Sequence, residues 1–360
     1  MTLIRELARE IIKGRRLTGE DDLSVFEHAD LEELAAGADE IRRALCGDHV
    51  DLCTIINGRS GRCSEDCKFC AQSSHNHTGC GQYGMLGTEE ILADCQERAA
   101  EGVHAYSIVT AGRTVVGRDL DHLTGVYREL HRQFPGMRLC ASHGMLTVEA
   151  FSQLKESGVT MAHCNLETSR RNFPNICTTH TYEDKLREIR AAQEAGLTVC
   201  SGGIIGMGET WQDRVDMALE LSGLGITSIP INALIPVKGT PFGELPRLTE
   251  DEIIRTVAMF RYLNPTAYIR MAAGRCYFKD GGRRLFTSGV NATITGNMLT
   301  TVGNNTEQDV AMLREMGLDV KSRSLISHRT TPASIDDATT SLHSTVSPME
   351  NHAAKVARYE

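Results

Sequence analysis

The sequence predicts an α/β fold of the (β/α)8 TIM-barrel type with an N-terminal helical cap, and three observations support this prediction. The chain has 360 residues, a length that repeated βα units often reach within one domain. From about residue 51, a short β-branched or apolar run is followed by a longer segment with apolar residues three and four apart, and this alternation recurs eight times. Hydrophobic residues make up 41% of the chain, which is enough to fill the core of such a barrel.

Residues 1–50 carry two amphipathic helical patterns and are expected to form the helical cap. Residues 51–320 are expected to form the barrel, with strands at 51–56, 104–109, 137–142, 160–167, 198–205, 227–234, 267–272 and 291–297. Helical periodicity between and after these strands predicts helices at 88–100, 123–134, 148–157, 182–195, 211–222, 250–262 and 306–316, and a short glycine-rich helix near 282–288. Beyond residue 320, Ser, Thr and His dominate, so residues 321–360 are expected to be a loosely ordered tail.

Several predicted helices carry recognisable start and stop signals. Thr88 and Thr249 are each followed by carboxylates, which is typical of a capping hydroxyl and of acidic residues at the positive end of the helix dipole. A glycine follows four of the predicted helices, where the left-handed conformation commonly ends a helix: Gly102, Gly158, Gly196 and Gly317. These signals support the predicted boundaries.

Charge and hydropathy patterns exclude several classes of protein. With 38 basic and 47 acidic residues, the formal net charge is −9, so a nucleic-acid partner is not expected. No apolar stretch approaches the roughly 18 residues of a membrane span, so no membrane association is expected. The first 16 residues alternate apolar and charged side chains instead of forming a secretion signal, so a cytoplasmic location is expected.

Cys63, Cys67 and Cys70 form a C-x3-C-x2-C motif just after the first predicted strand. Because disulfides are disfavoured in the cytosol, closely spaced cysteines there favour metal binding. Three thiolates at this spacing can hold three irons of a [4Fe-4S] cluster and leave the fourth iron open to a small molecule. Two alternatives remain, namely three ordinary thiols or a zinc site, which would need a fourth ligand such as Cys80, His75 or His77.

This motif, with Phe69 before the last cysteine, resembles that of the radical S-adenosylmethionine (SAM) enzymes. In those enzymes the open iron binds SAM, and the reduced cluster cleaves it to a 5′-deoxyadenosyl radical. Residues 63–74 are similar to the cluster loop of the biotin synthase family. The similarity covers about residues 5–320 and continues in the family order through residues 109–113, 165–169, 200–210, 232–241 and 270–275.

The resemblance implies an activity and its partners. The expected reaction is insertion of sulfur into dethiobiotin to give biotin, the last step of biotin biosynthesis. The expected cofactors are a [4Fe-4S] cluster, SAM and an auxiliary cluster, which is [2Fe-2S] in the family. A flavodoxin or ferredoxin is expected as the electron donor, a homodimer as the assembly, and no protein side chain as a general acid or base.

By the same resemblance, SAM is bound by Phe69, Glu167, Gly202, Ile204 and Gly206, with Glu209 beyond them. The Glu167 carboxylate is suited to accept hydrogen bonds from the two ribose hydroxyls. Glycines suit positions where backbone approaches a ligand closely. Asn165 and Asn232 are expected to face the lumen and bind the cyclic urea of dethiobiotin, because an amide both donates and accepts hydrogen bonds.

The auxiliary cluster is expected to be bound by Cys140, Cys200 and Arg270, but Ser107 stands where the family has a fourth ligand, a cysteine. Because iron-sulfur clusters favour thiolates, Ser107 is a doubtful ligand and the cluster type stays open. Cys276 shares the strand parity of Arg270 and is the alternative ligand if the extended conformation continues that far. The remaining cysteines are expected to be ordinary core or surface residues: Cys46, Cys53, Cys80, Cys95, Cys164 and Cys177.

Two further positions differ from the family pattern. His163 replaces an asparagine near the substrate, and His180 replaces an arginine near the SAM carboxylate.

Two other functions remain as alternatives. One alternative is a radical SAM enzyme of the same barrel type that acts on a small metabolite without inserting sulfur. The other is a non-catalytic iron-sulfur electron-transfer protein or zinc-binding protein.

Overall fold

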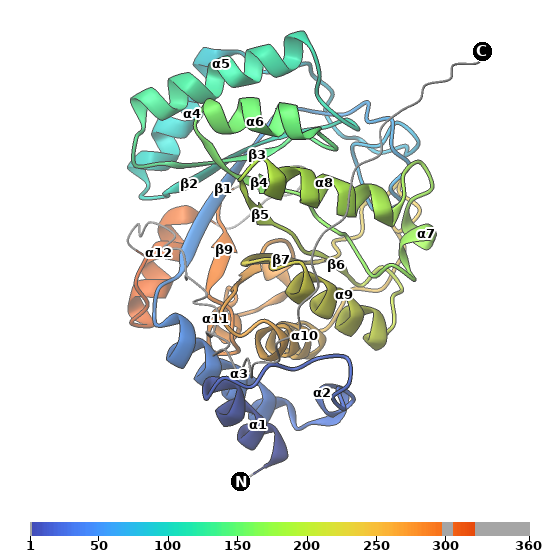
Figure 1. Ribbon diagram of the computed structural model, residues 1–360, viewed down its shortest axis with the longest axis vertical. Helices are drawn as coiled ribbons and strands as arrows, with labels where there is room; N and C mark the ends of the chain where they lie inside the picture. The colour runs from blue at the N-terminus through green and yellow to red at the C-terminus, as the bar shows by residue number, and fades with distance from the viewer. Residues whose placement is uncertain (1, 297–304, 321–360) are drawn as a thin grey trace, which may run out of the picture. The chain divides into compact units, whose positions relative to one another are not determined.

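A computed structural model describes residues 2–296 and 305–320, and Figure 1 shows its barrel and surrounding helices. Nine parallel strands form the sheet, in the order β5-β4-β3-β2-β1-β9-β8-β7-β6, and a further pairing of β5 with β7 closes it into a barrel. The strands are β1 Asp51–Arg59, β2 Ala105–Thr110, β3 Arg138–Ser142, β4 Val159–His163, β5 Thr198–Cys200, β6 Gly203–Ile205, β7 Ser228–Ala233, β8 Tyr268–Met271 and β9 Ala292–Ile294. The predicted (β/α)8 fold is confirmed, while the predicted tail at 321–360 lies outside the described residues.

The fifth predicted strand is divided into β5 and β6, and this division allows the barrel to close. Cys200 at the end of β5 pairs with Ser228, whereas Gly203 at the start of β6 pairs with Ile231 further along β7. Between the two short strands, a Cβ atom on Gly202 would overlap with the carbonyl oxygen of Pro230. A glycine is therefore required where the two backbones approach each other.

The barrel helices match the predicted positions closely. They are α4 Thr88–Ala100, α5 Arg118–Gln133, α6 Val148–Glu156, α7 Phe173–Ile176, α8 Tyr182–Glu194, α9 Trp211–Gly223, α10 Glu250–Leu263, α11 Arg283–Phe286 and α12 Thr306–Glu315, with the 3-10 turn η1 Arg275–Tyr277. Helix α5 begins five residues before its predicted start, because its polar first turn hides the apolar spacing. The short helix α7 was not predicted from the pattern.

The capping predictions have mixed outcomes. Thr249 caps α10 by accepting a hydrogen bond from the Glu252 amide, as predicted. The prediction for Thr88 is wrong, because α4 starts at Thr88 itself and Gly87 occupies the N-cap position. The four predicted helix-ending glycines have φ angles of +86°, +105°, +78° and +75°, in the order Gly102, Gly158, Gly196 and Gly317. These positive angles confirm the predicted left-handed ends.

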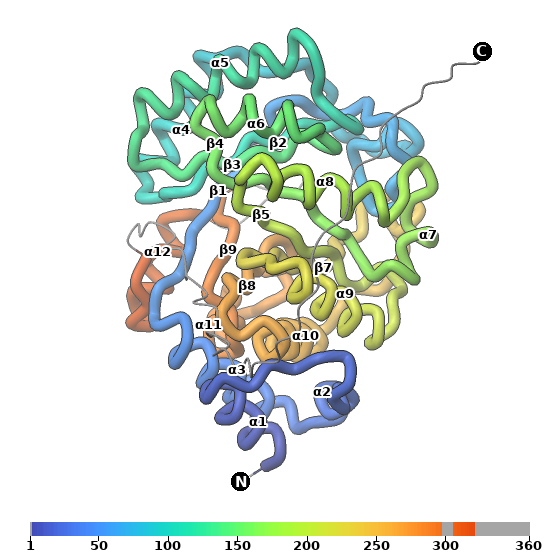
Figure 2. Tube along the Cα trace, viewed as in Figure 1, coloured from blue at the N-terminus to red at the C-terminus, as the bar shows by residue number. Residues whose placement is uncertain are grey.

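The N-terminal helices α1 Leu3–Ile12, α2 Val25–His28 and α3 Leu31–Cys46 pack beside α10 (Figures 1 and 2). The Tyr262 hydroxyl donates to the Ile4 carbonyl at 3.1 Å, and Arg255 donates to the Phe26 and Ala29 carbonyls at 3.0 and 2.8 Å. These bonds hold α1 and α2 beside α10, and α3 packs directly on α10.

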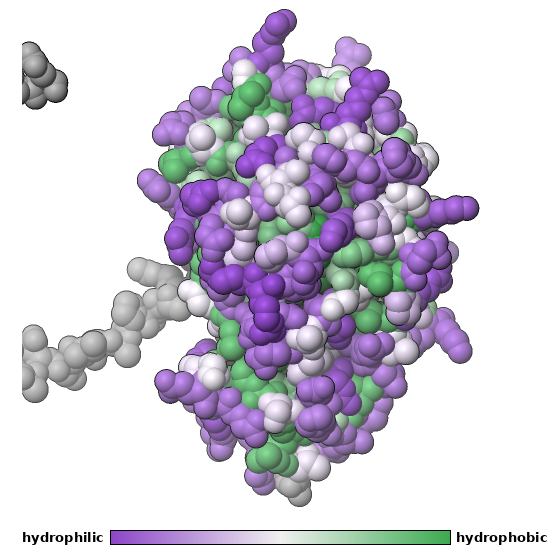
Figure 3. Space-filling model, turned by 90° about the vertical axis from the view of Figure 1, so that its right-hand side faces the viewer, coloured by the Kyte–Doolittle hydropathy of each residue, from purple (hydrophilic) through white to green (hydrophobic). Residues whose placement is uncertain are grey.

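Hydrophilic side chains cover most of the face shown in Figure 3, and the hydrophobic ones lie in scattered patches. Within residues 2–296 and 305–320, no helix combines the length and the apolar character that crossing a membrane requires.

Candidate active site

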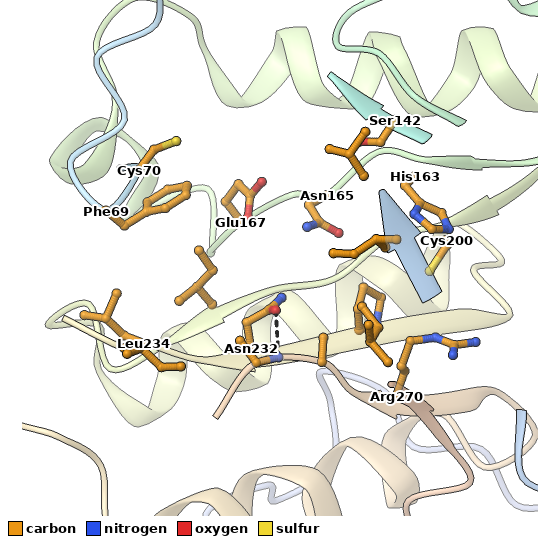
Figure 4. A pocket seen from close by; sticks show the side chains of 18 of the residues that line it. Phe69, Cys70, Ser142, His163, Asn165, Glu167, Cys200, Asn232, Leu234 and Arg270 are labelled. Atoms are coloured by element: carbon orange, nitrogen blue, oxygen red, sulfur yellow. Dashed lines mark hydrogen bonds between the residues drawn. The ribbon is translucent and has the colours of Figure 1, made fainter. Parts of the chain in front are cut away.

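A cavity of about 360 Å³ opens at the carboxyl ends of the barrel strands and extends into the lumen (Figure 4). Phe69 and Cys70, from the loop after β1, line its mouth together with Glu167. Cys200 and Arg270 line its deep end. The volume lies within the range of about 300 to 1,000 Å³ that is typical of small-molecule sites. One cavity therefore connects the cysteine loop with the interior of the barrel.

The cysteine loop is held in shape by its own hydrogen bonds. The Ser74 amide donates to the Cys63 carbonyl at 2.8 Å, and the Asn76 side chain donates to the carbonyls of Cys67 and Cys70 at 3.2 and 2.8 Å. All three cysteines are partly exposed and free of disulfides. The backbone of the loop is therefore fixed while its sulfur atoms remain available as ligands.

These three sulfur atoms suit a multi-iron cluster better than a single ion. Ligands of one zinc ion, at about 2.3 Å from the metal, must lie within about 4.6 Å of one another. Among the described residues, the groups whose ligand atoms lie within 4.8 Å of one another do not include Cys63 with Cys67 and Cys70. Two of the three additional zinc ligands suggested by the sequence have other partners, since His75 Nε2 contacts the Ser64 carbonyl and Cys80 contacts Ser60. The residues present fit a [4Fe-4S] cluster held by three thiolates.

Glu167 projects into the cavity next to Phe69 (Figure 4). It is a non-glycine residue with a φ of +69°, in the sparsely populated left-handed region. Its amide donates to the Gly202 carbonyl at 3.1 Å, and its carbonyl accepts from the Ile204 amide at 2.8 Å. Burial raises the pKa of Glu167 to about 6. The strained backbone is thus fixed by β6, and a carboxylate is presented to the cavity as a hydrogen-bond acceptor.

The other predicted SAM-binding residues have different environments. Ile204 lines the cavity, whereas Gly202 and Gly206 shape the backbone around it, Gly206 with a φ of +93°. Glu209 accepts hydrogen bonds from the amides of Gly206 and Met207 at 2.8 and 2.7 Å. The Glu209 carboxylate therefore stabilises the turn after β6.

We expect Gly202→Ala to destabilise the barrel by about 3 kcal/mol, because the added methyl group overlaps with the Pro230 carbonyl in a closely packed region. Urea unfolding followed by circular dichroism measures this change. Gly125→Ala is the matched control, since that glycine lies in α5 with nothing within 4 Å of its Cβ position. Because alanine favours a helix, this control should be stabilised by up to about 1 kcal/mol. Equal stabilities of the two variants would contradict the close approach.

Asn165 and Asn232 both line the cavity, and both also bind backbone. The Asn165 side-chain oxygen accepts from the Gly202 amide at 3.3 Å. The Asn232 side chain donates to the Gly203 carbonyl at 3.2 Å and accepts from the Ala273 amide at 3.1 Å. Since a side-chain amide has two N–H donors and two acceptor lone pairs, each asparagine keeps capacity to bind a ligand.

Three cysteines gather at the deep end of the barrel: Cys53, Cys140 and Cys200, which are 3%, 0% and 2% exposed. The Cys53 thiol donates to the Thr54 carbonyl at 3.5 Å. Its interaction with the Cys140 thiol, together with burial, raises the pKa of Cys53, while the same interaction lowers the pKa of Cys140. Cys53 and Cys200 both line the cavity, and Cys200 lies 3.1 Å from the Ser228 hydroxyl. The predicted pair Cys140 and Cys200 is thus accompanied by a third thiol on β1.

Ser107 and Arg270, the other predicted ligands of the auxiliary cluster, are engaged with protein groups. The Ser107 hydroxyl lies 3.3 Å from His163 Nδ1, and burial lowers the pKa of His163 to about 4. Arg270 lines the deep end of the cavity, where it pairs with the Asp51 carboxylate and donates to the Thr293 carbonyl at 3.0 Å. Iron-sulfur clusters favour thiolates over the hydroxyl and guanidinium groups of these two side chains.

The prediction that Cys276 faces the lumen is wrong. The extended conformation it required ends with β8 at Met271, and Gly274 then turns the chain with a φ of +103°. Cys276 lies on the following 3-10 turn and is exposed. Cys53 is a candidate that the sequence does not reveal: it shares the strand parity of Ile55, which also lines the cavity, but the sequence alone does not show which parity of this strand faces the lumen.

His180 is buried behind the cysteine loop and does not line the cavity described above. Its Nδ1 atom lies 2.6 Å from the Glu65 carboxylate and 3.2 Å from the sulfur of Cys177. The Cys67 thiol donates to Cys177 over 3.8 Å, which lowers the pKa of Cys177 to about 4. Cys177, expected to be an ordinary thiol, is therefore in contact with a predicted cluster ligand.

Comparisons with known proteins agree with the sequence and the site. Residues 59–221 match the family model of the radical SAM superfamily, and residues 230–319 match that of the biotin and thiamin synthesis associated domain. The chain is 60% identical over 317 residues to the biotin synthase of Clostridium beijerinckii, covering 88% of this chain and all of that protein. It is also 60% identical over 314 residues to the biotin synthase of Alkaliphilus metalliredigens, covering 87% and 98%.

The crystal structure of methylornithine synthase has the same fold, with a TM-score of 0.77, 19% identity, and coverage of 88% of this chain and 97% of that one. At this identity the likeness concerns the fold alone. The two biotin synthases carry the functional comparison, because each is matched over nearly its whole length. The chain belongs to the biotin synthase family of radical SAM enzymes, which insert sulfur into their substrate.

Proposed function

We propose that the chain binds SAM and dethiobiotin side by side in the barrel cavity and converts dethiobiotin to biotin there. The observation that carries this proposal is the continuous lining of the cavity, from Cys70 at the mouth to Cys53 and Cys200 at the deep end. A substrate in the middle of this cavity lies between the predicted [4Fe-4S] site and the thiol cluster. Such an arrangement favours sulfur insertion over the alternative radical reactions that need no second cluster.

Cys63, Cys67 and Cys70 would hold the [4Fe-4S] cluster as thiolates. When bound and reduced, the cluster supplies the electron that cleaves SAM to methionine and a 5′-deoxyadenosyl radical, which abstracts hydrogen from unactivated carbons. Phe69 and Ile204 supply apolar surface for SAM at the mouth, and Glu167 accepts hydrogen bonds from its ribose hydroxyls. The protein's own contribution is to position the two molecules and to exclude water from the cavity.

Asn165 and Asn232 would orient the urea ring of dethiobiotin. Both side chains reach the cavity from opposite sides, one following β4 and the other on β7 (Figure 4). Their backbone partners Gly202, Gly203 and Ala273 fix the amide planes, so each free N–H or lone pair has a set direction. A pre-oriented amide loses little entropy when it binds a ligand.

We expect Asn165→Ala or Asn232→Ala to weaken dethiobiotin binding by about 1 to 3 kcal/mol, because ligand polar groups are then left unpaired. This corresponds to a rise in Kd of about 5-fold to 150-fold, measured by calorimetry with full-length protein. Asn175→Ala, at an exposed amide outside the cavity, should bind dethiobiotin like the wild type. Unchanged affinity in both cavity variants, with unchanged unfolding midpoints, would mean that these asparagines do not bind the substrate.

The auxiliary cluster would be held by Cys53, Cys140 and Cys200. These three buried thiols come from β1, β3 and β5, so they approach one another across the lumen. Cys53 compensates for the missing family cysteine at Ser107, and Arg270 would lie beside the cluster. A [2Fe-2S] cluster, the type expected from the family, is held by four protein ligands. The three thiolates named here are one fewer than that number.

The electron donor would be a flavodoxin or ferredoxin, and the assembly a homodimer. The thiol-rich sites require a reducing compartment, which favours the cytoplasm.

The proposed homodimer is tested by sedimentation equilibrium of the purified protein, which is expected to give twice the chain mass. A monomer at micromolar concentration would contradict the dimer.

A further inference from the structure

Two segments far apart in the sequence lie side by side behind the cysteine loop. The Lys68 amide of the loop donates to the Ile176 carbonyl at 2.9 Å. Two residues earlier in the loop, the Asp66 carboxylate accepts a hydrogen bond from the Thr178 amide at 2.8 Å. The loop and the segment at the end of α7 therefore run in opposite directions, and these bonds bracket one cysteine of each segment.

The bracketed cysteines are Cys67 and Cys177, and their sulfur atoms are 3.8 Å apart. Opposed residues of antiparallel segments have Cα atoms about 4.5 to 5.5 Å apart, and a disulfide spans about 4.4 to 6.8 Å between its Cα atoms. The two backbones are therefore close enough for a disulfide. Side-chain rotation has to bring the sulfur atoms to the bond length of about 2.0 Å.

The pair also differs from the other cysteines of the loop in its contacts. Among the described residues, the hydrogen bond that joins Cys67 to another sulfur leads to Cys177, and not to Cys63 or Cys70. Cys67 is partly exposed, whereas Cys177 is 3% exposed. A small molecule can therefore reach the pair at Cys67, while the protein shields Cys177 from other reagents.

We propose that Cys67 and Cys177 form a reversible oxidation site, which closes to a disulfide when the chain lacks its [4Fe-4S] cluster and meets a small-molecule disulfide such as oxidised glutathione. One protein sulfur displaces a first glutathione and forms a mixed disulfide with the second, and the partner sulfur then displaces that second glutathione. Two protein S–H bonds are lost and one S–S bond forms. Oxidised glutathione takes up the two electrons and two protons and leaves as two glutathione thiols.

The disulfide would withhold Cys67 from the cluster and keep it in a recoverable form. A thiol that is oxidised alone proceeds to sulfinic acid, which is not reversed in most proteins, whereas a disulfide is reopened by a thiol. Transient disulfides of this kind are the usual ones in the cytosol. The effect on the cluster rests on the proposed role of Cys67 as a ligand, whereas the disulfide itself does not.

Peptide mapping of cluster-free full-length protein tests the disulfide. After treatment with oxidised glutathione and blocking of free thiols, mass spectrometry is expected to show peptides linked through Cys67 and Cys177 in wild type and in Cys63→Ala. Cys177→Ser, a nearly isosteric change, should lose this linked pair completely. Its absence from wild type, whether the two thiols stay free or link to Cys63 or Cys70, would overturn the site even if Cys177→Ser fails to fold.

The effect on the cluster has its own readout. Disulfide-bonded wild type is expected to assemble the cluster from iron and sulfide more slowly than reduced wild type, and prior treatment with dithiothreitol should restore the rate. Equal rates for the two forms would overturn the competition between disulfide and cluster. If reduced wild type assembles no cluster, the proposed function fails instead, because the peptide map does not depend on the cluster.

Discussion

Replacing Cys63, Cys67 or Cys70 with alanine is expected to abolish reductive cleavage of SAM in each variant. Three thiolates are the minimum that holds a [4Fe-4S] cluster with one open iron, so none of the three is dispensable. The barrel should remain folded, because the three side chains are only partly buried and lie in a loop outside the core. The measurement is formation of 5′-deoxyadenosine from SAM and dithionite without oxygen.

Cys80→Ala is the matched control for this experiment. Cys80 belongs to the same region, but its sulfur forms hydrogen bonds with Ser60 and the Gly81 carbonyl and does not line the barrel cavity. This variant should therefore cleave SAM at the wild-type rate. If any of the three cluster variants formed 5′-deoxyadenosine as fast as Cys80→Ala, the assignment of that cysteine would be wrong.

Cys53→Ala is expected to remove the auxiliary cluster and to stop biotin formation while SAM cleavage continues. The variant deletes one of three buried thiols at the deep end of the cavity and leaves the cysteine loop intact. Iron and sulfide analysis of protein purified without oxygen should show loss of one cluster and retention of the other. SAM cleavage should therefore continue while biotin formation stops, since only sulfur insertion needs the thiols at the deep end of the cavity.

Ser107→Ala and Cys276→Ala serve as comparisons. The Ser107 hydroxyl is bonded to His163, and Cys276 is exposed outside the lumen, so both variants should keep their iron and sulfide. Loss of iron in Ser107→Ala together with full iron in Cys53→Ala would show that serine ligates the cluster as a direct replacement of the family cysteine. That pattern would refute the role given to Cys53.

The regular part of the fold could be predicted from the sequence because apolar periodicity reports burial directly. Helix α4 has the predicted bounds, and every predicted strand is present. The break between β5 and β6 was not predictable, because it arises from the closing contact of Gly202 with Pro230 on a strand that follows later in the chain. Such a contact leaves no local pattern in the sequence.

Prediction of the candidate site from the sequence is limited in the same way. The cysteine loop was visible because its ligands lie within eight consecutive residues. The sequence predicts a core residue at Cys53, since a single buried cysteine is usually one, and only barrel closure brings it to Cys140. Cys67 and Cys177 are 110 positions apart, so no spacing rule joins them. Residues that meet through tertiary structure alone require the structure.

The central claim is that one cavity combines radical generation with sulfur insertion into dethiobiotin. Its most direct test is anaerobic incubation of the wild-type protein, with both clusters assembled, with SAM, dithionite and dethiobiotin, followed by mass spectrometry of the products. We expect a product that has gained one sulfur and lost two hydrogens relative to dethiobiotin, together with two molecules of 5′-deoxyadenosine for each molecule of biotin. Formation of 5′-deoxyadenosine with dethiobiotin recovered unchanged would contradict the claim.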